Sequence, residues 1–206
     1  MRKSLWIILA VLAAAVSAPY ASADATPTLD SGSPSGAGPL YTWTYTIAVD
    51  SNEALSPTLN SGCSPATPCP AGSFFTLYDI VGLTAPSAPA NWGSSIQLTG
   101  ITPSFVSPGD SATLENLTFF YTGPAAPGPF TIDGFSFQST SNLVGQIQYA
   151  FSAESNGTGD SGRGFVAGPT GAVTAPEPSS VALMVLGLGL VFVTRKRIGQ
   201  SFPQAS

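Results

Sequence analysis

Large apolar residues alternate with small polar residues along 41–50, which reads Tyr-Thr-Trp-Thr-Tyr-Thr-Ile-Ala-Val-Asp. This period of two is typical of a half-buried β-strand, in which successive side chains point to opposite faces of a sheet. Further segments with strand character lie at 74–81, 94–101, 112–121, 130–137 and 145–152. Turn-forming residues separate them, such as Pro108-Gly109-Asp110, Gly123-Pro124 and Asn156-Gly157.

Strands without amphipathic helices predict an all-β fold. Two antiparallel sheets packed face to face, a jelly-roll-like β-sandwich, are the simplest arrangement, and the lack of crossover helices excludes a parallel α/β sheet. We expect the sandwich to span 40–153. The segments 24–39 and 154–175, rich in Gly, Ser, Thr and Pro, are predicted to be linkers.

The first residues have the pattern of a secretory signal peptide. Arg2 and Lys3 precede an apolar run over 5–16, and the small residues Ala21 and Ala23 stand before Asp24. The run is shorter than the roughly 20 residues that span a bilayer. We therefore expect signal peptidase to remove residues 1–23, so that the mature chain begins at Asp24.

Export determines how the two cysteines are interpreted. Cys63 and Cys69 lie in a Pro-rich loop, and in an oxidising compartment such a pair is expected to form a disulfide. A redox or metal role is disfavoured because the CxxC spacing is absent and the chain has no histidine.

Composition removes several classes of chemistry. Without histidine, the chain has no imidazole base and no His-ligated metal site. Arg163 is the single basic residue between 24 and 175, and the chain has a net charge of −5, so nucleic-acid binding is not expected. No glycine-rich phosphate loop is present. We expect no cofactor, no metal and no enzymatic activity.

The C-terminal region combines three features in order. Pro176-Glu177-Pro178 precedes an apolar run over 181–193, and Arg195-Lys196-Arg197 follows it. We predict one transmembrane helix over 179–194, with the basic cluster and the tail 198–206 in the cytoplasm. At 1.5 Å per residue the helix is about 24 Å long, shorter than a hydrocarbon core of about 30 Å, which suits a temporary stop.

Together, residues 176–197 resemble the PEP-CTERM sorting signal of Gram-negative bacteria. The resemblance implies recognition by an exosortase, a membrane-embedded protease that cuts near the Pro-Glu-Pro element and passes the protein to the cell surface. This tail is also known as an ice-binding-protein C-terminal domain, a name that describes no activity. The segments 74–79 and 116–123 and Trp92 resemble uncharacterised PEP-CTERM proteins, whose bodies have no assigned chemistry.

The resemblance implies a non-enzymatic exported protein of the cell surface or exopolysaccharide matrix, whose partners during export are signal peptidase and exosortase. One alternative is a secreted carbohydrate-binding module that stacks sugars on an exposed row of Tyr41, Trp43 and Tyr45. Another is ice binding by the row of Thr42, Thr44 and Thr46, although we expect no neighbouring strand to repeat that row.

Acidic residues leave two further alternatives. A carboxylate enzyme would need two acids that converge in a cleft, and Asp79 and Glu115, which lie in strong β segments, are instead expected to be edge or capping residues. Calcium could bind Glu154, Asn156 and Asp160, but their spacing does not match an EF-hand, so a solvated loop is preferred.

Overall fold

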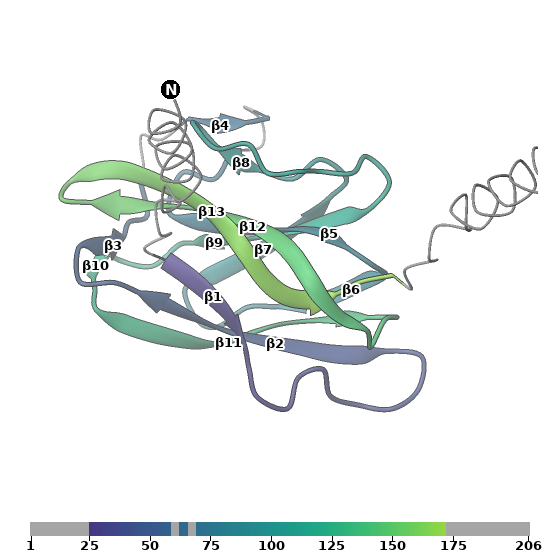
Figure 1. Cartoon of the computed structure of the whole chain (residues 1–206). Helices are drawn as coiled ribbons and strands as arrows, with labels where there is room; N and C mark the ends of the chain where they lie inside the picture. Colours follow the sequence, from purple (N-terminus) through teal and green to yellow (C-terminus); the bar gives the residue numbers. More distant parts are fainter. Residues whose placement is uncertain (1–24, 59–61, 66–68, 172–206) are drawn as a thin grey trace, which may run out of the picture. The chain divides into compact units, whose positions relative to one another are not determined.

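The computed structural model describes residues 25–58, 62–65 and 69–171, and every regular element in these ranges is a β-strand (Figure 1). In chain order the strands are β1 (Ala25–Leu29), β2 (Tyr41–Val49), β3 (Glu53–Leu55), β4 (Cys63–Ser64), β5 (Phe74–Ile80), β6 (Leu83–Ser87), β7 (Trp92–Gln97), β8 (Thr102–Pro103), β9 (Glu115–Tyr121), β10 (Ala126–Pro127), β11 (Phe130–Ser139), β12 (Val144–Ser155) and β13 (Thr158–Pro169). The all-β prediction is confirmed for this part of the chain.

The predicted signal peptide at 1–23 and the predicted helix at 179–194 lie outside the described residues. Among the residues that are described, no helix is long and apolar enough to cross a membrane. A compact unit ends at Gly171, and a second unit begins at Ala172.

The strands form two main antiparallel sheets. The smaller sheet has the order β1-β2-β11-β6. The larger sheet has the order β10-β3-β12-β5-β9-β7, and β13 pairs with β12 outside this path. A short third sheet joins β4 and β8. With four and seven strands, the two main sheets are less equal than those of an eight-stranded jelly roll.

Strand β12 is the hub of the larger sheet. Along one edge it pairs with β13 over its whole length, from Val144 opposite Pro169 to Ser155 opposite Thr158. Its other edge holds two separate strands, since residues 149–152 pair with β5 and residues 154–155 pair with β3. The larger sheet is therefore continuous only because β12 is present.

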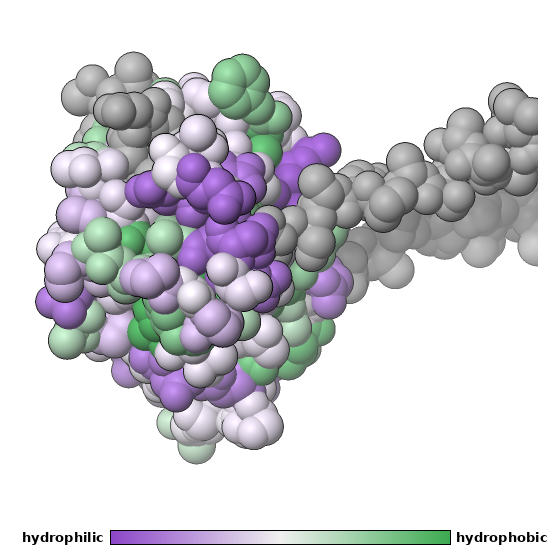
Figure 2. Space-filling model, turned by 90° about the vertical axis from the view of Figure 1, so that its left-hand side faces the viewer, coloured by the Kyte–Doolittle hydropathy of each residue, from purple (hydrophilic) through white to green (hydrophobic). Residues whose placement is uncertain are grey.

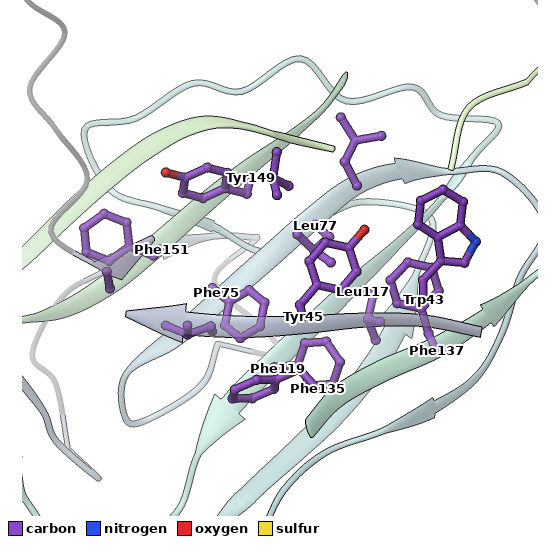
Figure 3. Close-up of a cluster of buried hydrophobic side chains, with 14 of the residues drawn as sticks. Trp43, Tyr45, Phe75, Leu77, Leu117, Phe119, Phe135, Phe137, Tyr149 and Phe151 are labelled. Atoms are coloured by element: carbon purple, nitrogen blue, oxygen red, sulfur yellow. The ribbon is translucent and has the colours of Figure 1, made fainter. Parts of the chain in front are cut away.

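The core lies between the two main sheets and is rich in aromatic rings (Figure 3). In β2 the alternation works as predicted, because Trp43, Tyr45, Ile47 and Val49 are buried while the intervening residues are partly exposed. Facing them from the larger sheet are buried residues at every second position of its strands, among them Phe75, Leu77, Leu117, Phe119, Tyr149 and Phe151.

Both predicted linkers are wrong in part. Residues 25–29 form the edge strand β1, where Pro27 is tolerated because β1 pairs with β2 alone. Residues 158–169 form β13, a long strand rich in glycine that is held by its pairing with β12. The turn between them has φ of +50° at Asn156 and +79° at Gly157, as a two-residue type I′ hairpin turn requires.

The predicted strands 94–101 and 112–121 are longer than the observed β7 and β9. The chain leaves the strand ladder of the larger sheet after Gln97 and rejoins it at Glu115. In between, side chains rather than another strand of this sheet bond to the backbone, since Asp110 accepts from the Gly100 amide and Asn116 donates to the Leu98 carbonyl. This excursion, residues 98–114, is called the strap below.

Candidate functional site

The strap lies on the outer face of the larger sheet, the face turned away from the core. Ile101 is buried against this face, and its carbonyl oxygen accepts hydrogen bonds from Thr76 Oγ1 at 2.7 Å and from Tyr78 OH at 2.9 Å. Thr76 and Tyr78 both belong to β5. The outer face of β5, although polar in part, is therefore covered by the protein itself.

Further along, the strap is attached to three strands in succession. The Arg163 guanidinium on β13 donates to the Ser107 carbonyl, the Gly109 amide donates to Gln148 Oε1 on β12 at 2.8 Å, and the Ser111 amide donates to Asp79 Oδ1 on β5 at 2.8 Å. Alternate strap residues thus bond to neighbouring parts of the sheet.

Asn116 and Asp110 fix the two ends of the strap. The buried Asn116 side chain donates from Nδ2 to the Leu98 carbonyl and to Asp110 Oδ1, each at 3.0 Å, and accepts from the Asp79 amide at 2.9 Å. Asp110 Oδ2 accepts from the Gly100 amide at 2.8 Å. The carboxylates of Asp79 and Asp110 therefore act as acceptors for backbone amides.

The cysteine loop rests on the strap. Strand β4 pairs with β8, with Cys63 opposite Pro103, and the Ser104 amide donates to the Gly62 carbonyl at 2.8 Å. Cys63 and Cys69 form the predicted disulfide. The disulfide prediction is confirmed, and the closed loop supports the strap at β8.

Two neighbouring hollows lie beside the strap. The larger, of about 350 Å³, is lined by Gln148, Arg163, Gly164 and Phe165. The smaller, of about 240 Å³, shares Gln148 and Phe165, and its wall also contains Asp79, Val81, Leu114, Gln146, Ile147, Thr170 and Gly171. We call the two hollows together the strap groove. It runs from Arg163 at one end to Asp79 at the other.

Phe165 is the aromatic side chain that lines both hollows, and 66% of its surface is exposed. It stands opposite Gln148 in the register of β12 and β13, and Gln146 lies two residues further along β12 on the same face. Figure 2, which faces the left-hand side of the domain as drawn in Figure 1, shows apolar side chains scattered among polar ones on that side.

The alternative that Tyr41, Trp43 and Tyr45 form an exposed row that stacks sugars is wrong. Trp43 and Tyr45 are buried in the core and Tyr41 is partly buried against it. The indole Nε1 of Trp43 donates to the Ser141 carbonyl at 3.1 Å, and Tyr45 OH donates to the Ala167 carbonyl at 3.0 Å. Their apolar faces serve packing, which is the other expected use of an alternating aromatic strand.

The threonine row does lie on the outer face of the smaller sheet, but the expectation that no neighbour repeats it is too simple. Thr28 on β1 stands opposite Thr46, and Ser136 on β11 stands opposite Thr44. The array is interrupted by charge, since Thr46 Oγ1 lies 2.7 Å from a carboxylate oxygen of Asp30 and equally close to one of Asp133.

The structure gives no support to a metal site built from the acidic residues that it describes. Within the described ranges no group of three or more His, Cys, Asp or Glu side chains comes together to hold a metal ion. Glu154 and Asp160 flank the β12–β13 turn, and their register positions, opposite Gly159 and Ala153, place them on opposite faces of the hairpin. Asp160 Oδ1 accepts from the Ser161 amide at 2.7 Å.

The strap groove was not predicted from the sequence, because Arg163 and Phe165 fall in the segment interpreted as a linker. One signal could have found it. The Asn156-Gly157 pair is typical of a two-residue hairpin turn, and it predicts that the residues after it pair with those before it. The predicted sorting residues, namely Ala21, Ala23, Asp24, Pro176, Glu177, Pro178, Arg195, Lys196 and Arg197, all lie outside the described residues.

The C-terminal region that contains the later of these sorting residues matches a known protein family. The family model of the PEP-CTERM protein-sorting motif matches residues 174–197. The chain therefore carries a PEP-CTERM protein-sorting motif, which implies exosortase-dependent processing and export through the membrane to the cell surface. No curated protein matches the chain.

Proposed function

We propose that this protein is a non-enzymatic component of the cell surface or exopolysaccharide matrix of a Gram-negative bacterium. The observation that carries the proposal is the match of the sorting motif to residues 174–197. The antiparallel β domain that precedes the motif is the part delivered to the surface.

In this proposal the two ends of the chain act in sequence. Signal peptidase cuts before Asp24, and the helix over 179–194 then stops transfer of the chain. Arg195, Lys196 and Arg197 hold the C-terminus in the cytoplasm by the positive-inside rule. Exosortase cuts near Pro176-Glu177-Pro178 and releases the domain from the membrane.

The absence of enzymatic activity is supported by how the domain uses its acids. Asp79 and Asp110 accept hydrogen bonds from backbone amides of the strap, Asp79 from Ser111 and Asp110 from Gly100. A glycosidase would instead need two carboxyl groups about 5 to 10 Å apart that both face the substrate. These contacts favour a structural role for Asp79, one of the two acids that were considered for catalysis.

The test is the intact mass of the protein recovered from the membranes, the surface and the medium of its native host. We expect a membrane form that begins at Asp24 and extends to Ser206, and a released form that begins at Asp24 and ends near Pro178. In a strain without exosortase the released form should be absent. A released form that persists in that strain, or a chain found only at full length in the membrane, would overturn the proposal.

A further inference from the structure

The strap groove combines an aromatic ring with amide side chains that are free to bind a ligand. Phe165 lines both hollows with two thirds of its surface exposed. The exposed side chain of Gln146 makes no hydrogen bond to another described residue. Gln148 uses Oε1 to hold the strap, which leaves the two donors of its Nε2 for a ligand.

The groove is also held in a fixed shape. Ser107, Gly109 and Ser111 of the strap bond to β13, β12 and β5, while the sheet itself forms the floor. Sites placed on a sheet and supported by hydrogen bonds of this kind are largely formed before a ligand binds. The larger hollow, about 350 Å³, falls in the size range of small-ligand sites.

We infer that the strap groove binds a neutral oligosaccharide, whose sugar ring stacks on Phe165 and whose hydroxyl groups bond to Gln146 and Gln148. A pyranose has one face of C–H groups, which an aromatic ring covers well, and a rim of hydroxyls that both donate and accept. An amide side chain also donates and accepts, so the lining of the groove matches this chemistry.

Charge selects among sugars. Between residues 25 and 171 the chain has nine Asp and Glu residues against Arg163 alone, so the field of the domain repels a polyanionic glycan. Arg163 lies at one end of the groove, where its guanidinium keeps N–H donors beyond the one used on Ser107. These donors can bond to sugar hydroxyls as well as to a carboxylate. The neutral class is therefore favoured.

Affinity electrophoresis of the purified full-length protein in mild detergent tests this inference. Native gels that contain dextran, barley β-glucan, xyloglucan or alginate provide three neutral glycans and one acidic glycan. We expect retardation by at least one neutral glycan, unchanged on raising the salt concentration, and none by alginate. In a neutral gel, Phe165→Ala and Gln146→Leu should each weaken the apparent affinity at least tenfold.

Phe105→Ala is the matched control, because Phe105 is fully exposed on the strap and lines neither hollow. It should bind like the wild type. The inference is overturned if no neutral glycan retards the protein, if Phe165→Ala and Gln146→Leu bind as tightly as the wild type, or if only alginate binds in a salt-sensitive way. Because binding is measured on purified protein, its failure is distinct from a failure of exosortase processing in the host.

Discussion

The ring of Phe75 meets the ring of Phe135 edge to face, with their centroids 5.2 Å apart and their planes at 82°. Phe75 belongs to β5 of the larger sheet and Phe135 to β11 of the smaller one. The same Phe135 ring contacts Trp92 and Phe119 at 4.9 and 5.2 Å. One side chain of the smaller sheet therefore packs against three aromatic rings of the larger sheet.

Replacing this ring should strongly destabilise the domain. Phe135→Ala removes a buried side chain from the middle of the interface between the sheets, and we expect the free energy of unfolding to fall by about 3 to 5 kcal/mol. Chemical denaturation monitored by circular dichroism measures the loss. Phe105→Ala, at a fully exposed phenylalanine, should change stability by less than about 0.5 kcal/mol. Similar effects of the two substitutions would contradict the packing described here.

Replacing Asn116 should also destabilise the domain, for a polar reason. Asn116→Ala leaves the Leu98 carbonyl, an Asp110 carboxylate oxygen and the Asp79 amide without their shared partner. Leaving buried polar groups unpaired costs about 1 to 3 kcal/mol. Hydrogen exchange should show the loss at the strap as well as in the global stability. Thr84→Ala, which removes an exposed contact of 3.4 Å, serves as the control and should have little effect.

The buried tyrosines make the domain sensitive to alkali. Burial raises the pKa of Tyr45, Tyr78 and Tyr149 above the ordinary value of about 10. In the unfolded chain these phenols lose their protons near that value, while in the folded chain they keep them. The unfolded state thus binds fewer protons above pH ~10, and stability falls there.

The expected slope is up to about 1.4 kcal/mol per pH unit for each tyrosine that stays protonated. The ultraviolet absorbance of tyrosinate measures this directly, since folded protein just above pH ~10 should lack the signal of three tyrosines. The missing signal should appear on addition of denaturant. Complete tyrosine ionisation in the folded protein at that pH would contradict the burial of these side chains.

Loss of the disulfide should weaken the domain moderately. Cys63 and Cys69 are separated by six positions in the chain, and closing a loop of this size contributes about 2 kcal/mol by chain entropy. The double variant Cys63→Ser with Cys69→Ser should lose about that amount in a thermal melt. A reducing agent should lower the stability of the wild type to the same level and leave the double variant unchanged. A reductant effect on the double variant would point to a different cause.

Changes in the sorting signal should affect location rather than folding. Replacing Pro176, Glu177 and Pro178 by alanine should leave the protein uncut in the inner membrane, because the element that the exosortase recognises is gone. Fractionation followed by mass measurement detects this. The control is Pro203→Ala, which changes a proline in the predicted cytoplasmic tail. The protein with this substitution should be released as the wild type is. Normal release of the triple variant would show that the enzyme does not read this element.

The sequence predicts a strand well where the strand's own alternation of apolar and polar residues shows which face is buried. β2 was placed to within one residue because large apolar side chains stand at every second position from Tyr41 to Val49. β13 was not predicted because its many glycines interrupt the alternation of apolar and polar residues. It is recognised as a strand only by its pairing with β12. Glycine carries no side chain that reports which face is buried, so the usual signal of a strand is absent.

The course of the strap could not be predicted for a different reason. Its bonds join residues far apart in the chain, since Ser107 and Arg163 are 56 positions apart and Gly109 and Gln148 are 39 apart. Such pairs leave no local periodicity. The C-terminal sorting motif, by contrast, could be predicted from adjacent residues, and the family match at 174–197 confirms the motif.

The place of β12 in the larger sheet has a consequence for the order of events during secretion. Before residues 144–155 emerge from the membrane, β3 with β10 and β5 with β9 and β7 are two separate ladders with no strand between them. An N-terminus-first chain can join them only when its last hairpin has crossed. Pairing of the larger sheet is thus completed only after most of the domain has crossed the membrane.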